Sequence, residues 1–335
     1  MRTINSIILG AVSALALTAA PALAGTNLRL ATAAPQGTPW ANQLDRFAAA
    51  VAEESGGDVT VEVFYNAQLG SEQDVVAQVA RGRIDMGFFS NTSVALQVPE
   101  SIFASMYGYF QSPEERECIL DNHMVEPMRA ATAARGFHFL GFGEVGPNHI
   151  VGTDEVRVPS DIAGRKIGVA ISPIAAMFWE TYGTIPSSVP VAESASALQT
   201  GLVEFALFPI TFYVAAGINA VAPTISLVGV QQTSALMLMS DSVRQGLTDD
   251  QRGAIDRAWA STPASQLRAE IAAFEGALLQ RHTDAGGTAV ELTPEEFAQW
   301  QAPLADFFNA AVASLGDEGR MMADALEAGR VACSQ

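Results

Sequence analysis

Two segments of this chain share one local pattern. In each, a helix ends at a glycine, and an acidic residue and a buried strand then follow. The first segment covers residues 76–88 and the second residues 197–209. In each, an apolar helical stretch stops at glycine (Gly82 or Gly201), and an acidic residue precedes a short apolar strand. The repetition predicts two α/β lobes whose strands point toward a shared cleft.

The N-terminal third of the chain is typical of parallel strands joined by helices. Alternating apolar residues predict strands over 28–32 and 59–64, and the first helix starts after Thr38. A third strand is expected over 84–89, after a second helical stretch. This βαβαβ order favours a parallel arrangement with helical crossovers. The polar run 90–93 then lies at a strand's carboxyl end, where open α/β sheets bind ligands.

Glycine and proline cluster in residues 141–148, and we place the first crossing between the lobes there. The apolar, β-rich stretch 224–240 is expected to return to the first lobe. The predicted organisation is a signal peptide over 1–24, lobe I over 25–146 plus 231–270, lobe II over 147–230 plus 271–310, and a C-terminal helix and tail over 311–335.

A long helical pattern over residues 248–282 is expected to bridge the two lobes. Thr248 and Gln251 form a capping box at its start. At 1.5 Å per residue, a helix of this length reaches beyond one lobe. Pro263 is the one expected kink or break.

The N-terminus has the three parts of an export signal. Arg2 supplies the positive charge, residues 7–17 form the apolar region, and Ala22-Leu23-Ala24 fits a cleavage site before Gly25. The apolar run is short for a bilayer span, which needs roughly 20 residues. An uncleaved anchor is the alternative. The sequence therefore predicts a periplasmic protein without stable membrane insertion.

Charge and motifs exclude several classes of function. The formal net charge of −18 opposes binding to nucleic acid. The four histidines form no zinc-binding pair, and the chain has no nucleophile elbow, phosphate loop or dinucleotide fingerprint. We therefore expect no enzyme activity, no metal and no cofactor.

The two cysteines, Cys118 and Cys333, lie far apart in the sequence. An oxidising compartment would allow them to form a disulfide that ties the tail to the first lobe. Two unpaired thiols are the alternative, because spacing along a chain does not fix a distance in space.

Five motifs occur in an order that closely resembles one receptor family. They are Tyr65–Gly70, Gly82–Met86, Pro159–Lys166, Ala197–Glu204 and Leu247–Asp250. Over nearly the whole mature chain the sequence resembles the DctP-type solute receptors of tripartite ATP-independent periplasmic (TRAP) transporters. The resemblance implies an α/β, two-lobed periplasmic-binding-protein-like fold with mixed sheets and a long lobe-bridging helix. It also implies that the lobes close over a small molecule and deliver it to the membrane subunits of a TRAP permease.

The resemblance also indicates where a ligand binds. Such receptors hold a carboxylate with an arginine on the strand after the Gly-x-Lys turn, and the matching residue here is Gly168. Without that arginine, a carboxylate is poorly compensated in a dry cleft. We therefore expect a more apolar or aromatic ligand, with a cation stacked on phenylalanine rings as a variant. The candidate ligand-binding residues are Ala33, Gln36, Glu72, Phe89, Ser90, Asn91, Asn148, His149, Gly168, Val191, Phe208 and Phe212.

Other interpretations remain open at this point. The chain could be a binding module that reports to a membrane sensor, a secreted enzyme on the same scaffold, or a degenerate receptor that binds little. Trp40 and Trp179 are expected in the hydrophobic core.

Overall fold

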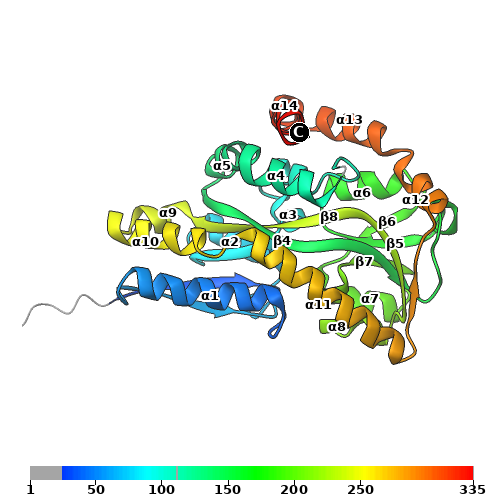
Figure 1. Ribbon diagram of the computed structural model, residues 1–335, viewed down its shortest axis with the longest axis horizontal. Coiled ribbons are helices and arrows are strands. Elements are labelled where there is room, and N and C mark those ends of the chain that lie inside the picture. The colour runs from blue at the N-terminus through cyan, green and yellow to red at the C-terminus, as the bar shows by residue number, and fades with distance from the viewer. Residues whose placement is uncertain (1–24, 111, 335) are drawn as a thin grey trace, which may run out of the picture.

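The computed structural model describes residues 25–110 and 112–334, so the predicted signal peptide lies outside the described residues. In this part of the chain nine strands form one mixed sheet, in the order β2-β1-β3-β8-β4-β7-β5-β6, with β9 paired to β8. Figure 1 shows helices covering the sheet on both sides. The predicted α/β class with mixed strand directions is confirmed.

The elements have the following bounds. The strands are β1 (Thr26–Thr32), β2 (Val59–Phe64), β3 (Met86–Ser90), β4 (Phe137–Gly152), β5 (Lys166–Val169), β6 (Ile185–Ser188), β7 (Phe205–Phe208), β8 (Thr224–Ser240) and β9 (Thr288–Val290). The helices are α1 (Pro39–Glu54), α2 (Glu72–Ala80), α3 (Asn91–Val94), α4 (Pro113–His123), α5 (Val125–Ala133), α6 (Pro173–Glu180), α7 (Ser194–Gln199), α8 (Ile210–Ala215), α9 (Asp241–Gln245), α10 (Asp249–Ala260), α11 (Ala264–Asp284), α12 (Pro294–Gln301), α13 (Leu304–Ser314) and α14 (Gly316–Cys333). Short 3₁₀ turns cover Pro99–Ser105, Pro159–Asp161, Val191–Glu193 and Ile218–Ala220.

The two longest strands belong to both lobes. β4 has 16 residues and β8 has 17, and they pair antiparallel along their lengths. The C-terminal half of β8 pairs with β3 of the first lobe, whereas its N-terminal end pairs with β9 of the second. The C-terminal end of β4 pairs with β7. The register shifts between Glu144 and Gly146 and again between Asn148 and Ile150, and such irregularities bend strands. The lobes therefore meet at the middle of this pair.

Helix α1 shows how sequence positions the first lobe. Thr38 is its N-cap and accepts a hydrogen bond from the backbone N–H of Ala41 at 3.4 Å. Leu44, Phe47 and Val51 recur at helical spacing and are fully buried against β1 and β2. Each such buried side chain stabilises the fold by about 1.5–3 kcal/mol. The start of α1 is thereby fixed beside the carboxyl end of β1.

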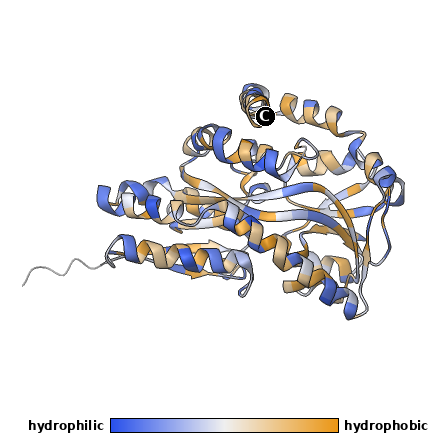
Figure 2. Cartoon of the chain, viewed as in Figure 1, coloured by the Kyte–Doolittle hydropathy of each residue, from blue (hydrophilic) through white to orange (hydrophobic). Residues whose placement is uncertain are grey.

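An aromatic cluster joins the second lobe to the first. Tyr107 of the first lobe stacks on Phe178 of α6, with ring centroids 3.6 Å apart. Phe307 of α13 packs edge-on against both rings. In Figure 2, α6 and α13 carry mostly hydrophobic residues, as burial between layers requires. The C-terminal helices thus pack across both lobes.

The single long helix predicted over 248–282 is two helices, α10 and α11. The capping box of Thr248 and Gln251 starts α10 as expected. Pro263 is extended (φ −65°, ψ 146°) and stands before α11, which continues to Asp284. Proline cannot donate the helical hydrogen bond, and its ring clashes with the preceding turn, so the break falls there. The 21 residues of α11 alone pass from β4 to α8 (Figure 1).

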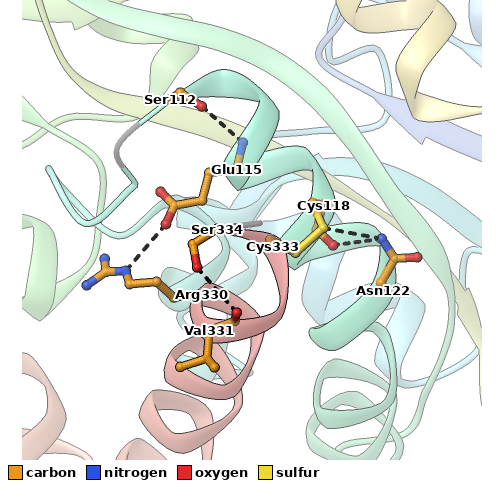
Figure 3. The surroundings of a disulfide bond; sticks show 8 residues. All are labelled: Ser112, Glu115, Cys118, Asn122, Arg330, Val331, Cys333 and Ser334. Carbon is orange, nitrogen blue, oxygen red and sulfur yellow. Dashed lines mark hydrogen bonds and ion pairs between the residues drawn. A yellow bond between two sulfur atoms is a disulfide. The ribbon is translucent and has the colours of Figure 1, made fainter.

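The two cysteines are joined in a disulfide between α4 and the last residue of α14 (Figure 3). Their Cα atoms lie 5.9 Å apart, and the bond connects positions 215 residues apart. Arg330 and Glu115 form an ion pair at 3.5 Å beside it. A Cβ at Gly329 would lie 2.9 Å from the Ile119 side chain, so glycine lets α14 approach α4 closely.

We predict that the double variant Cys118→Ser/Cys333→Ser is less stable than the wild type by about 2–4 kcal/mol, because the bond restricts the unfolded chain. Urea unfolding followed by circular dichroism measures the loss. Dithiothreitol should lower the wild type to the same midpoint and leave the variant unchanged. A wild-type midpoint that does not respond to the reductant would contradict the prediction.

Candidate ligand-binding cavity

A cavity of about 130 Å³ lies between the two lobes. The carboxyl ends of the parallel strands β1, β3, β5 and β7 reach it through Thr32, Ser90, Val169 and Phe208, as expected for an α/β sheet. Most of its wall is apolar. Its aromatic lining comes from Trp40, Phe88, Phe89, Tyr107, Trp179, Phe208 and Phe212.

Most of the predicted ligand-binding residues line this cavity. They are Ala33, Glu72, Phe89, Ser90, Asn148, Gly168, Val191, Phe208 and Phe212. They come from both lobes, although they are distant in the sequence. Whether they contact a ligand stays a prediction.

Three predicted residues do not line the cavity. Gln36 is exposed in the loop before α1. Asn91 turns into the first lobe, where its Nδ2 donates to the Ser101 carbonyl at 3.0 Å and its Oδ1 accepts from Ser105 at 2.9 Å. His149 follows Asn148 on β4, and successive side chains of a strand point to opposite faces. It is buried near Gly229 instead, and burial lowers its pKa to about 4, which keeps it neutral.

Several cavity residues escaped the sequence analysis. Trp40 and Trp179, expected in the core, are buried but line the cavity. Tyr107 and Gln231 also line it. Tyr107 follows a 3₁₀ turn and Gln231 lies within β8. The signal in the sequence was a polar residue at the carboxyl end of a strand, and neither residue lies at such an end.

Neutral polar side chains lie near the middle of the antiparallel β4–β8 pair. The Asn148 side-chain amide of β4 donates to Gln231 Oε1 at 3.0 Å and to Thr233 Oγ1 at 2.8 Å, both on β8. These hydrogen bonds join the side chains of the two neighbouring strands and hold the amides of Asn148 and Gln231 in place at the cavity wall. They supply polarity without charge.

Glu72, the first residue of α2, is the carboxylate of this cavity. Its Oε2 accepts hydrogen bonds from the hydroxyls of Ser90 and Ser93, both at 2.7 Å. Its Oε1 accepts the Ser90 backbone N–H at 3.3 Å. Burial raises the pKa of Glu72, and the serine hydrogen bonds oppose that rise.

Arginine, lysine and histidine are absent from the described residues that line the cavity. Two buried arginines are instead paired with other acids. Arg116 contacts Glu144 at 2.7 Å, and Arg268 contacts Asp121 at 2.9 Å and Glu144 at 3.5 Å. Within residues 25–110 and 112–334, the structure also places no three potential metal-ligating side chains together.

Glu275 lies where the lobes meet. It projects from α11, and its Oε1 accepts the backbone N–H of Thr211 at 3.3 Å. A Cβ at Gly146, where φ is +116°, would lie 3.2 Å from that oxygen, so glycine serves both backbone angle and space. Burial raises the pKa of Glu275 to about 7, although its backbone hydrogen bonds act in the opposite direction.

The sequence pattern of one family, bacterial extracellular solute-binding protein, family 7 (DctP), matches residues 30–314. The chain belongs to this family. It is therefore a receptor of the TRAP type, and its family consists of periplasmic solute-binding proteins, not enzymes. The resemblance seen in the sequence motifs is confirmed. In the described part of the chain, helices long and apolar enough to cross a bilayer are absent.

One known protein similar to this chain supports the same assignment, and two solved structures share the fold of this chain. A solute-binding protein of Verminephrobacter eiseniae is 26% identical over 253 residues, 75% of this chain and 76% of its own. The structure of a TRAP periplasmic solute-binding protein from Xanthobacter autotrophicus with bound β-D-galacturonate matches with a TM-score of 0.84 at 21% identity, covering 91% of this chain and 99% of that one. One from Sulfurospirillum deleyianum with bound succinate has a TM-score of 0.82 at 22% identity, covering 91% and 98%. The predicted two-lobed fold is confirmed.

We predict that Glu275→Gln stabilises the protein at pH 8 and has little effect near pH 4. The raised pKa means that the wild type keeps the full contribution of this group below about pH 4.3 and loses it as the pH rises through about 7. The gain at pH 8 is about 3 kcal/mol at most. Urea unfolding at both pH values measures it.

Glu270→Gln provides the control on the same helix. It removes an ion pair with Arg46 at 3.0 Å and should bring no gain at pH 8. Equal pH dependence of the wild type and Glu275→Gln would show that the buried carboxyl is not the source.

Proposed function

We propose that this protein is the periplasmic receptor that captures a small, largely apolar or aromatic molecule between its lobes and delivers it to the membrane subunits of a TRAP permease. The observation that carries the ligand class is a cavity with seven aromatic side chains and no cationic one among its described lining. The expected export signal and the family support the periplasmic location.

The charge of the cavity argues against a simple carboxylate. The similar structures hold β-D-galacturonate and succinate, which are carboxylates. Such an ion loses its hydration in a closed cleft and needs a cation or several donors in exchange. Here Gly168 occupies the expected arginine position, and Glu72 would repel an anion.

The size of the cavity and its aromatic lining suit a molecule built around one ring. An engineered apolar cavity of about 150 Å³ binds benzene, and this one measures about 130 Å³. Phe208 and Phe212 stack with centroids 5.5 Å apart, and Trp40 lies 6.5 Å from Phe212. Aromatic rings pack favourably at centroid distances of about 4.5–7 Å. This part of the wall is therefore suited to contact with the ring of a ligand.

The strands β4 and β8, which belong to both lobes, supply a hinge about which the lobes can close. The middle parts of β4 and β8 carry register shifts, and the apposed walls of the cavity belong to different lobes. A ligand that contacts both walls favours the closed form through those contacts.

The test is titration calorimetry of the purified protein against matched neutral aromatic and carboxylate compounds. We expect heat from toluene-sized neutral aromatics such as benzyl alcohol and none from succinate or galacturonate at equal concentration. Tight binding of succinate without any response to the aromatic set would overturn the proposed ligand class.

Gly168→Arg should shift the preference toward carboxylates. The introduced guanidinium would compensate an anion, with a gain of about tenfold or more for a charge-assisted bond. A Cβ at this position has room, since its nearest neighbour lies 3.4 Å away. Gly168→Ala is the control and should bind succinate no better than the wild type. Thermal melts of both variants would establish folding, and a folded arginine variant without succinate binding would contradict the prediction.

A further inference from the structure

A second compartment adjoins the main cavity and is nearer to solvent. It has a volume of about 150 Å³. Its own lining includes Asn66, Ser71 and Gln73 from the first lobe and Ala215 from the second. Asn66 and Ala215 are exposed. The cleft therefore has an inner part whose lining includes seven aromatic side chains and an outer part whose lining includes exposed residues.

Glu72 stands at the junction, since it lines both compartments together with Ala33, Val191 and Phe212. Its Oε2 is used by two serine hydroxyls at 2.7 Å, whereas Oε1 accepts a single longer bond of 3.3 Å. A carboxylate oxygen can accept two hydrogen bonds. Oε1 therefore has capacity for a donor that enters from the cleft.

The surroundings of Glu72 favour a positive donor. Both compartments lack arginine, lysine and histidine in their described lining, so the carboxylate has no cationic partner there. Phe212 belongs to both compartments and stacks on Phe208, and aromatic faces attract cations. The net charge of −18 also attracts cations toward the protein over a longer range.

We infer that the ligand carries a protonated amine that pairs with Glu72 at the junction, while its apolar or aromatic part occupies the inner cavity. This inference rests on the proposed function and specifies the ligand's charged group and orientation. An amine on a short arm from one ring fits both the inner volume and the position of the acid.

A purely structural role for Glu72 makes a different prediction. Its bonds to Ser90 and Ser93 connect α2 to the end of β3 and the start of α3. If that were its whole role, removing the charge would change the binding of charged and neutral ligands alike. The ratio of two affinities therefore separates the alternatives.

The experiment uses benzylamine, benzyl alcohol and benzoate as probes, which differ in charge but share a ring. In calorimetry on the wild type, benzylamine should bind at least about tenfold more tightly than benzyl alcohol, and benzoate should be weakest. In Glu72→Gln that ratio should fall to about one, with benzyl alcohol little changed. Asp74→Asn removes an exposed charge from the same helical turn, at a residue that lines neither compartment, and should keep the wild-type ratio.

Each outcome discriminates between the two proposals. Benzyl alcohol that binds as well as benzylamine, or an unchanged ratio in Glu72→Gln, would overturn the amine inference alone. Lack of detectable benzylamine binding to the wild type would also overturn it. If benzoate alone bound, both the inference and the proposed apolar ligand class would fail.

Discussion

The antiparallel pairing of β4 and β8 is the interaction on which the two-lobed architecture depends. β8 pairs with β3 near its C-terminal end and with β9 near its N-terminal end, whereas β4 pairs with β7 at its C-terminal end, so one hydrogen-bonded ladder runs through both lobes of the single sheet. The backbone polar groups of the crossing are thereby satisfied within the protein. The same pairing brings Asn148 beside Gln231, so the connection between lobes also forms part of the cavity wall.

A buried acid on β4 pairs with two buried arginines beside the cavity. Glu144 directly precedes a register shift in β4 and accepts the backbone N–H groups of Val145 and Gly146 at 3.1 and 3.0 Å. It also contacts the guanidinium groups of Arg116 and Arg268. A buried ion group is tolerated when its partners are complete. These arginines are held by acids and do not line the cavity, so Glu72 is the one charged side chain among the described residues of its lining.

Local patterns predicted the features that depend on local chemistry. The strand ends near Ser90 and Phe208 and the small residue at Gly168 could be identified, because turns and alternation are encoded nearby. Strand alternation implies that Asn148 and His149 point to opposite faces, but the sequence did not show which of them faces the cavity, because the register shift between Asn148 and Ile150 depends on the pairing with β8. Tyr107 and Trp179 reach the cavity only through the packing of both lobes. Their burial resembles that of core residues until the cavity is seen.

The bond between Cys118 and Cys333 has a temporal consequence. One sulfur lies on α4 and the other lies 215 residues further along the chain, on α14. A nascent chain therefore carries Cys118 without its partner until the 215 residues up to Cys333 have been synthesised. The bond can form only after the C-terminal helix has been made, and a product that ends before Cys333 would keep Cys118 as an unpaired thiol.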